Sequence, residues 1–145
     1  MSAKEVVLAA IDVIHSNNAA RALDYYHDDV DFIGYAPVEL FPHMGARHGK
    51  AEAMRTVTAL HQQFSRMRHE IEFIAAEGDA VAVILRLHLQ KQENDRIIQL
   101  QVANFFQVRD GLIVQQRQFF DSFDVVQQVL EVDLAEVLTK RQQGP

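Results

Sequence analysis

A run of alternating apolar and polar residues over about residues 69–120 constrains this chain more than any other feature. The hydrophobic period in this run is 2, which is typical of β-strands, whereas the segments on either side have the period of helices. Three turn signals divide the run into long strands, and they are Glu77-Gly78-Asp79, Gln92-Glu93-Asn94-Asp95 and Arg109-Asp110-Gly111. Long strands joined by short turns predict an antiparallel meander.

Helical patterns surround the alternating run. The expected elements outside it are a helix over residues 3–16, a short helix over 19–27, a strand over 30–35, a loop over 36–48, a helix opening at Gly49 and a last helix from near Ser122. The N-cap expected for the last helix is Asp121 or Ser122. The loop contains Pro37, Pro42 and Gly45, and its length makes it a candidate pocket rim. Helices segregated from an antiparallel sheet indicate an α+β fold.

Composition and charge exclude several classes of function. The chain has 145 residues, of which 48% are hydrophobic, and a formal net charge of −6. These values are typical of one soluble globular domain. Binding to nucleic acid depends on clustered Lys and Arg, so the acidic balance argues against DNA and RNA as partners. The absence of cysteine excludes disulfides and thiolate chemistry.

The N-terminal segment carries no pattern of a secretory signal or a membrane span. Its apolar residues are interrupted by Glu5 and Asp12, which breaks any continuous hydrophobic stretch. We therefore expect a cytoplasmic protein with no membrane partner. We also expect a single domain over residues 1–138, followed by a disordered tail over 139–145.

The strand over residues 80–90 has two different faces, and the residues alone leave open which one lies inside. One face carries Val81, Val83, Leu85, Leu87 and Leu89, and the other carries Ala82, Ile84, Arg86, His88 and Gln90. If the apolar face packs on the helices, Arg86 and His88 lie outside. If the apolar face points outward, five apolar side chains need a partner chain.

The two following strands place amides in apolar rows. Asn104 shares a strand face with Leu100, Val102 and Phe106 and must find a hydrogen-bond partner, because an unpaired buried polar group costs about 1–3 kcal/mol. Gln116, Gln118 and Phe120 share a face of the last strand, and the Asp110-Gly111 turn places Gln118 about opposite Ala103 and Asn104. We expect Asn104 and Gln118 to bond to each other or to a shared water.

Several motifs together resemble the nuclear transport factor 2-like superfamily. They are the order of elements, His48-Gly49-Lys50 at the start of the third helix, the hairpin from Phe105 to Ile113, and Arg117-Gln118-Phe119-Phe120-Asp121 before the last helix. The nearest branches are the SnoaL-like polyketide cyclases and limonene epoxide hydrolase. The resemblance implies a cone-shaped, curved antiparallel sheet around three N-terminal helices, with an additional C-terminal helix, in a cystatin-like α+β barrel. The cone would enclose a cavity.

The resemblance also implies an orientation for the strand over residues 80–90. Arg86 matches a cavity arginine of limonene epoxide hydrolase, and His88 stands where that family has an aspartate. With these two side chains inside, the stripe from Val81 to Leu89 would face outward and predict a homodimer. The catalytic carboxylates and histidine of the two branches match His88, Asn104 and Gln118, so that chemistry is not carried over unchanged.

The candidate site follows from these matched positions. His88 is the only group among them that exchanges a proton near pH 7, so we expect it to be the acid or base, with Arg86 holding an anionic oxygen. Asn104 and Gln118 would orient a carbonyl or hydroxyl group, and Tyr35 is the tyrosine expected at the mouth. The other expected lining residues, which could equally fill the core outright, are Phe32, Ile11, Ile14, Leu60, Phe64, Leu100, Val102 and Phe120. His15, His27, His61 and His69 are expected to be solvated.

Two hypotheses for function remain open. The first is an enzyme without cofactor or metal, namely a cyclase, isomerase, dehydratase or hydrolase that acts on a hydrophobic polyketide- or terpenoid-like compound through His88. The second is a non-catalytic module for small-molecule binding or dimerisation that has lost the family's carboxylates. In both, the partner is a hydrophobic small molecule.

Overall fold

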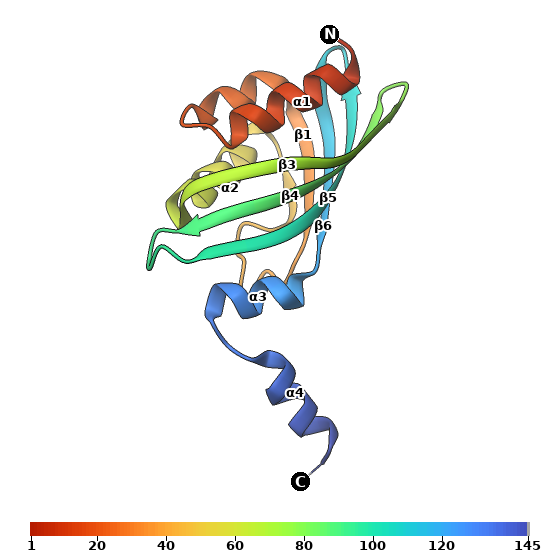
Figure 1. Cartoon of the computed structure of the whole chain (residues 1–145). Coiled ribbons are helices and arrows are strands. Elements are labelled where there is room, and N and C mark those ends of the chain that lie inside the picture. The colour runs from red at the N-terminus through yellow and green to blue at the C-terminus, as the bar shows by residue number, and fades with distance from the viewer. Residues whose placement is uncertain (145) are drawn as a thin grey trace.

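A curved sheet is the framework of the computed structural model, which describes residues 1–144 (Figure 1). Its six strands are β1 (Tyr26–Tyr35), β2 (Gly45–His48), β3 (Phe64–Glu77), β4 (Ala80–Lys91), β5 (Ile97–Arg109) and β6 (Leu112–Phe120). They are ordered β2-β1-β6-β5-β4-β3, so the sheet stays open, with β2 and β3 at its edges. The expected α+β cone is confirmed.

The meander from β3 to β6 is antiparallel throughout, as the alternation predicts. Asp110 and Gly111 join β5 to β6 with φ angles of 52° and 77°. Two consecutive residues with positive φ fit the turn that suits the twist of a tight hairpin, and this turn type favours Asp-Gly. In contrast, β1 pairs parallel to β6, so the sheet is mixed rather than wholly antiparallel.

Three N-terminal helical segments pack on the sheet, namely α1 (Ala3–Ile14), the 3₁₀ helix η1 (Ala19–Tyr25) and α2 (Lys50–Gln63) (Figure 1). The side chain of Ser2 caps α1 by accepting a hydrogen bond from the Glu5 amide at 3.2 Å. The buried face of α1 joins the same hydrophobic cluster as the inner residues of β4 and β5. None of the helices over residues 1–144 has the length and apolar character needed to cross a membrane.

The C-terminal part contains two helices where the sequence predicts one. α3 (Ser122–Leu130) begins at the expected cap, Asp121, whose side chain accepts from the Asp124 amide at 3.1 Å. Glu131 then adopts a left-handed conformation, with φ 55°, and ends the helix. α4 (Leu134–Gln142) extends away from the sheet (Figure 1), so the tail expected over residues 139–145 begins inside a helix, and Pro145 lies outside the described residues.

Two other boundaries differ from the expectation. The strand β2 lies within the segment predicted as a loop, where it pairs with β1 through only four residue pairs. β3 begins at Phe64, directly after α2, although the sequence indicates strand only from about residue 69. No Gly, Pro or Asn separates α2 from β3, so the chain gives no local signal of the change.

The orientation expected for β4 is wrong. Val81, Val83, Leu85, Leu87 and Leu89 are all buried, and they point toward the helices. Burying each such side chain stabilises the fold by about 1.5–3 kcal/mol relative to exposing it, so the apolar face takes the inside. The stripe is therefore not a dimer interface, and the homodimer predicted from it loses its basis.

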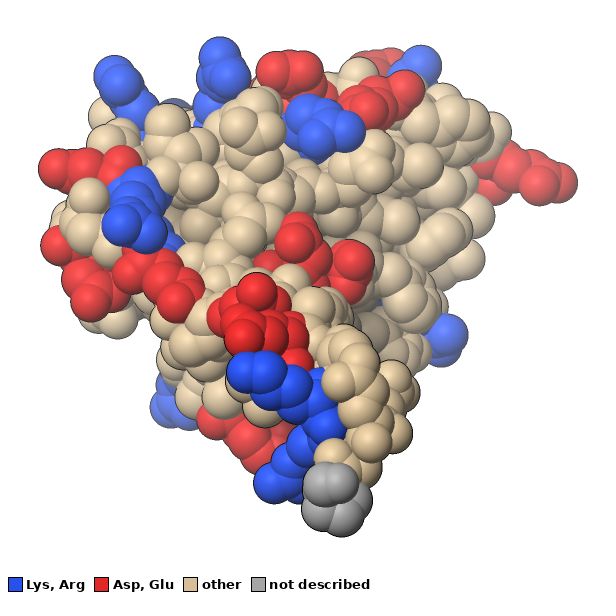
Figure 2. Space-filling view, turned by 60° about the horizontal axis from the view of Figure 1, so that its bottom comes forward, with Lys and Arg blue, Asp and Glu red and all other residues tan. Residues whose placement is uncertain are grey.

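Charged residues are distributed without a dominant sign over the surface seen in Figure 2, where Lys and Arg side chains alternate with Asp and Glu.

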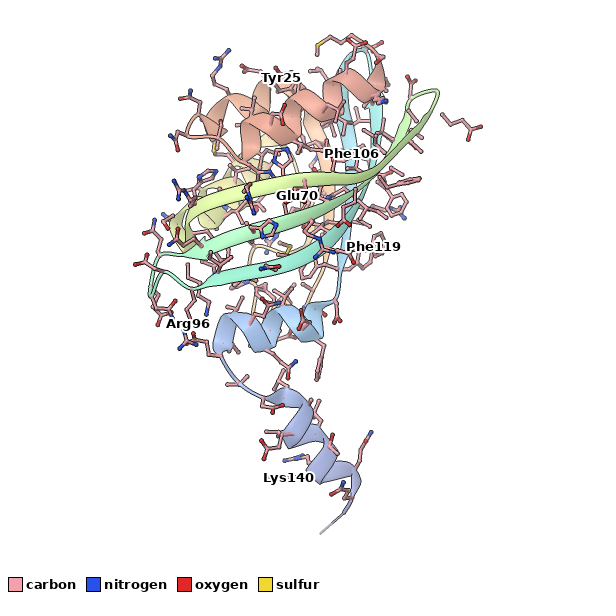
Figure 3. The ribbon with its side chains drawn as sticks, in the orientation of Figure 1. Tyr25, Glu70, Arg96, Phe106, Phe119 and Lys140 are labelled. Atoms are coloured by element: carbon pink, nitrogen blue, oxygen red, sulfur yellow. The ribbon has the colours of Figure 1, made fainter. Side chains whose placement is uncertain are left out.

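On the outer face of the sheet, Arg86 Nε lies 3.3 Å from Glu72 Oε1, and His88 Nε2 lies 3.4 Å from Glu70 Oε1. Both carboxylates belong to β3, and Glu70 is labelled in Figure 3. Arg86 and His88 thus lie on the opposite side of the sheet from α1 and α2.

Candidate functional site

A cavity of about 430 Å³ lies between the inner face of the sheet, the helices α1 and α2 and the segment that precedes β2. Most of its wall is apolar, including Ile11, Ile14, Phe32, Leu60, Leu85, Leu87 and Phe106. A concave, largely apolar space of this size with a few polar groups is typical of small-molecule sites. Its wall contains no Asp, Glu, Lys or Arg from the described part of the chain.

Three polar side chains from neighbouring strands form a hydrogen-bonded line in the wall. The hydroxyl of Tyr26 on β1 donates to Gln116 Oε1 on β6 at 2.8 Å. Gln116 Nε2 then donates to Asn104 Oδ1 on β5 at 2.9 Å. Burial raises the pKa of the Tyr26 phenol above its usual range, which keeps the phenol protonated and donating.

This hydrogen-bonded line leaves the side-chain amide nitrogen of Asn104 available to donate to a ligand. Because Asn104 Oδ1 accepts from Gln116, the Asn104 amide nitrogen keeps its two N–H donors. Gln118 pairs with Asn104 in the strand register and also belongs to the wall. A direct bond between Asn104 and Gln118, one of the two arrangements expected, is absent from the described residues, where Asn104 bonds to Gln116 instead. Gln116 and Tyr26 are functional candidates that the sequence analysis missed.

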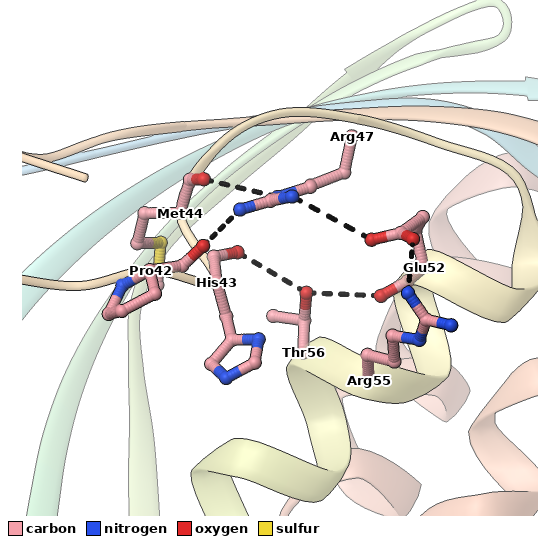
Figure 4. A network of polar contacts seen from close by, with 7 residues as sticks. All are labelled: Pro42, His43, Met44, Arg47, Glu52, Arg55 and Thr56. Atoms are coloured by element: carbon pink, nitrogen blue, oxygen red, sulfur yellow. Dashed lines mark hydrogen bonds and ion pairs between the residues drawn. The ribbon is translucent and has the colours of Figure 1, made fainter. Parts of the chain in front are cut away.

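The rim of the cavity is tied to α2 by a network of polar contacts (Figure 4). Arg47 donates to the carbonyls of Pro42 and Met44 and lies 3.8 Å from a carboxylate oxygen of Glu52. Thr56 Oγ1 lies 3.4 Å from the His43 carbonyl oxygen, which it approaches as a donor. The rim residues that line the cavity, namely Phe41, Pro42, His43 and Met44, are therefore positioned by contacts to a helix.

A second polar group contains histidines that were expected to be solvated. His15, at the end of α1, belongs to the cavity wall, and its Nδ1 lies 2.9 Å from His69 Nδ1 on β3. His69 Nε2 lies 3.1 Å from Asp12 Oδ1, and His61 Nε2 lies 2.8 Å from the Ile14 carbonyl oxygen. Burial, followed by the charges of His69 and His61, lowers the pKa of His15 to about 4. The expectation of a solvated His15 is wrong.

A weak signal for this group is present in the sequence. Asp12 and His15 are three residues apart on α1, which places them on one helix face. His69 shares a strand face with Met67, which packs against the core. In the part of the chain that the structure describes, these side chains do not converge into a group of three that could hold a metal ion.

The structure sorts the expected site residues into three groups. Those in the cavity wall are Ile11, Ile14, Phe32, Leu60, Asn104 and Gln118. Those in or against the hydrophobic core, outside the cavity lining, are Phe64, Leu100, Val102 and Phe120. Those on the outer surface are Arg86, His88 and Tyr35, and their expected place in the cavity is wrong. Tyr35 is 44% exposed and stacks on Phe119 with ring centroids 4.3 Å apart.

Comparisons with known proteins agree with this architecture. The sequence profile of the SnoaL-like domain matches residues 7–116, while a search of curated proteins finds no match. A solved structure named as an isomerase from Rhodopseudomonas palustris is 26% identical, with a TM-score of 0.78, over 87% of this chain and 93% of that chain.

Two further solved structures are similar in fold. One, named as a SnoaL-like polyketide cyclase from Jannaschia sp. CCS1, is 19% identical with a TM-score of 0.76, over 88% of this chain and 90% of that chain. The other is TerC co-crystallised with polyporic acid, 18% identical with a TM-score of 0.78, over 90% of this chain and 98% of that chain. With its profile match extending over most of its length, this chain belongs to the SnoaL-like domain family, and its fold is that of nuclear transport factor 2-like proteins.

Proposed function

We propose that this protein is a cofactor-independent enzyme that binds a hydrophobic polyketide- or terpenoid-like compound carrying a carbonyl or hydroxyl group. The reaction would be an isomerisation, cyclisation, dehydration or hydrolysis. Similar structures named as an isomerase and as a polyketide cyclase support the first two of these reactions. Another similar structure was crystallised with polyporic acid, an organic small molecule.

The observation that carries the proposal is the hydrogen-bonded polar strip of Tyr26, Gln116 and Asn104 in a largely apolar cavity wall. Asn104 and Gln116 are 3% and 9% exposed, and their bond leaves the Asn104 amide N–H groups as donors. Donors fixed before the ligand arrives stabilise an oxygen that gains negative charge, because they need no reorganisation. Apolar walls would accommodate the hydrocarbon part of the same molecule.

The second candidate is a binding module without catalysis. One observation favours it, namely the lack of Asp and Glu in the described cavity wall, because carboxylates are common general acids and bases. Such a module would bind the same class of compound and release it unchanged. Binding with no turnover of any panel member would support the module over the enzyme.

The experiment is a screen of enones, epoxides and polyketide-like ketones, with binding followed by calorimetry and turnover by chromatography. Asn104→Leu should weaken binding of a carbonyl compound by about tenfold, which corresponds to one hydrogen bond of about 1.4 kcal/mol. The matched control is Gln101→Leu, an amide on the same strand whose side chain bonds to Glu72 on the outer face. Equal affinities for wild type and Asn104→Leu would contradict the proposed role of the strip.

A further inference from the structure

A line of three side chains leads from the cavity wall to the surface. His15 lies in the wall and contacts His69 through the two Nδ1 atoms, which are 2.9 Å apart. The opposite nitrogen of His69, Nε2, lies 3.1 Å from Asp12 Oδ1. The His69 side chain is 17% exposed and the Asp12 side chain is 74% exposed. The line therefore joins an apolar cavity to water.

The contacts determine which nitrogen of each ring carries a proton. Asp12 is a carboxylate and can only accept, so His69 Nε2 is the donor in that contact. A neutral His69 then has a lone pair on Nδ1, and His15 Nδ1 must donate to it. In neutral His15 this leaves Nε2 without a proton. Nε2 has no hydrogen-bond partner among residues 1–144, and it is the free nitrogen of a residue in the cavity wall.

We propose that His15 is the acid/base group of this cavity and that His69 and Asp12 position it and connect it to solvent. The inference rests on the proposed function, because it assigns a base to that same site. It also replaces His88, which lies on the outer face beside Glu70. His15 is the catalytic residue in this assignment, and His69 and Asp12 are positioning residues.

The surroundings of His15 keep its imidazole in the base form. The titratable groups around it are His61 from α2, His69 from β3 and, beyond His69, Asp12 from its own helix. Burial together with His69 and His61 lowers the pKa of His15 to about 4. His61 Nε2 donates to the Ile14 carbonyl, which satisfies the end of α1 next to His15. His43 is the other imidazole in the described cavity wall.

The proposed step is a proton transfer that needs no co-reactant. His15 Nε2 accepts a proton from a ligand C–H group next to a carbonyl, and the electron pair of that bond moves to the carbonyl oxygen as an enolate. An amide N–H such as that of Asn104 would stabilise the enolate oxygen. The Nδ1 proton of His15 can pass to His69, so that the positive charge moves toward Asp12. His15 Nε2 then gives its proton to a different carbon of the enolate while His69 returns the Nδ1 proton to His15, which completes an isomerisation and restores two neutral rings.

The first test is nitrogen NMR of the wild-type protein, using long-range proton–nitrogen spectra of the histidine rings. At pH 7 we expect His15 to be neutral, with the proton on Nδ1 and none on Nε2, and His69 to carry its proton on Nε2. Lowering the pH should leave the His15 signals unchanged until the pH approaches 4. A His15 ring that carries its proton on Nε2, or that titrates near 6.5 like a free histidine, would overturn the proposal.

The second test uses 5-nitrobenzisoxazole, a probe in which a base removes the C3–H proton of the isoxazole ring, the N–O bond breaks, and the ring-opened product is a coloured cyano-nitrophenolate. His15→Gln should slow the protein-catalysed reaction at least about tenfold, since a positioned base contributes typically about 10²–10⁴-fold. His69→Gln should shift the midpoint of the pH–rate profile upward, because His69 lowers the pKa of His15. A merely structural role for His69 would not move that midpoint. The matched control is His27→Gln, which removes an imidazole that accepts from the Asp29 amide.

The outcomes separate this inference from the proposed function. If the ketone panel binds and His15→Gln reacts with the probe as fast as wild type, the assignment of His15 is overturned and the binding site stands. If no panel compound binds, the proposed function fails. The NMR result still decides the arrangement of His15 and His69 on wild-type protein, even if a variant does not fold.

Discussion

The two faces of the sheet carry different kinds of polar residue. On the inner face, Asn104 and Gln116 bond to each other within apolar surroundings. On the outer face, Arg86 and His88 meet carboxylates of β3, and the exposed rings of Tyr35, Phe105 and Phe119 pack together. The inner face therefore holds neutral amides that bond to each other, while on the outer face the Arg86 guanidinium pairs with the Glu72 carboxylate.

The comparison shows that a histidine beside an arginine on a strand does not by itself indicate a site. Ionised groups keep most of their hydration on an exposed face, whereas burial without a partner is costly. A cavity therefore favours neutral polar groups with fixed donors and acceptors, as in the line from Tyr26 to Asn104. The following predictions test this difference, beginning with the largest effect.

Placing a charge on the inner face should prevent stable folding. Leu85 is 3% exposed, so Leu85→Arg should lose at least about 4 kcal/mol in the free energy of unfolding, through lost burial and an unpaired buried charge. The neighbouring change Ile84→Arg, on the outer face, should cost about 1 kcal/mol or less. Urea unfolding measures both. A Leu85→Arg protein as stable as Ile84→Arg would contradict the assigned orientation of β4.

Lowering the pH should reduce the contribution of His15 to the free energy of unfolding, whereas raising the pH should reduce that of His48. The pKa of His15 in the folded protein, about 4, lies below its unfolded value of 6.5. Because the unfolded chain binds the proton more readily, the contribution of His15 to the free energy of unfolding is complete above pH 6.5 and falls below it. That stabilisation falls by about 2–3 kcal/mol between pH 6.5 and 4. The hydrogen bond from His48 to Asp31, at 2.7 Å, raises the pKa of His48. Its contribution is therefore present below pH 6.5 and is lost as the pH rises through the raised value.

The measurement is urea unfolding from pH 4 to pH 8 for wild type, His15→Gln and His48→Gln. The difference between wild type and His15→Gln should shrink as the pH falls, and that between wild type and His48→Gln should shrink as the pH rises. Parallel curves for wild type and His15→Gln would show that His15 is solvated.

Removing the tyrosine hydroxyl from the polar line should have a moderate effect. Tyr26→Phe leaves Gln116 Oε1 without its donor and should cost about 1–2 kcal/mol. The adjacent Tyr25→Phe is the matched control, because the described structure gives the Tyr25 hydroxyl no side-chain partner, and it should change stability by less than about 0.5 kcal/mol. Equal losses for the two variants in urea unfolding would count against the line.

Breaking an ion pair on the outer face should have the smallest effect. Arg86 and Glu72 have side chains that are 38% and 34% exposed, and exposed ion pairs contribute about 0–1 kcal/mol. Arg86→Gln should therefore change the free energy of unfolding by less than about 1 kcal/mol, and less at high salt. A loss above about 2 kcal/mol in the free energy of unfolding would show that this ion pair contributes more than the exposure of its side chains indicates.

The sequence by itself determined the local features of this protein. Period-2 alternation predicted the four strands of the meander, and Asp110-Gly111 predicted the tight turn that joins two of them. Asp121 was recognisable as a helix cap, and Asn104 as an amide that needs an inner partner. These features depend on neighbouring residues and on backbone preferences, which a sequence contains.

Only the tertiary structure decided which face of β4 lies inside and which distant residues meet. A strand pattern is the same for both orientations, and the packing of α1 against the sheet selected the apolar face. The bond between Tyr26 and Gln116 joins residues 90 positions apart, and that between His15 and His69 joins residues 54 apart. The physical reason is that long-range contacts depend on how whole elements pack, so the chemistry of the cavity became visible only in the folded chain.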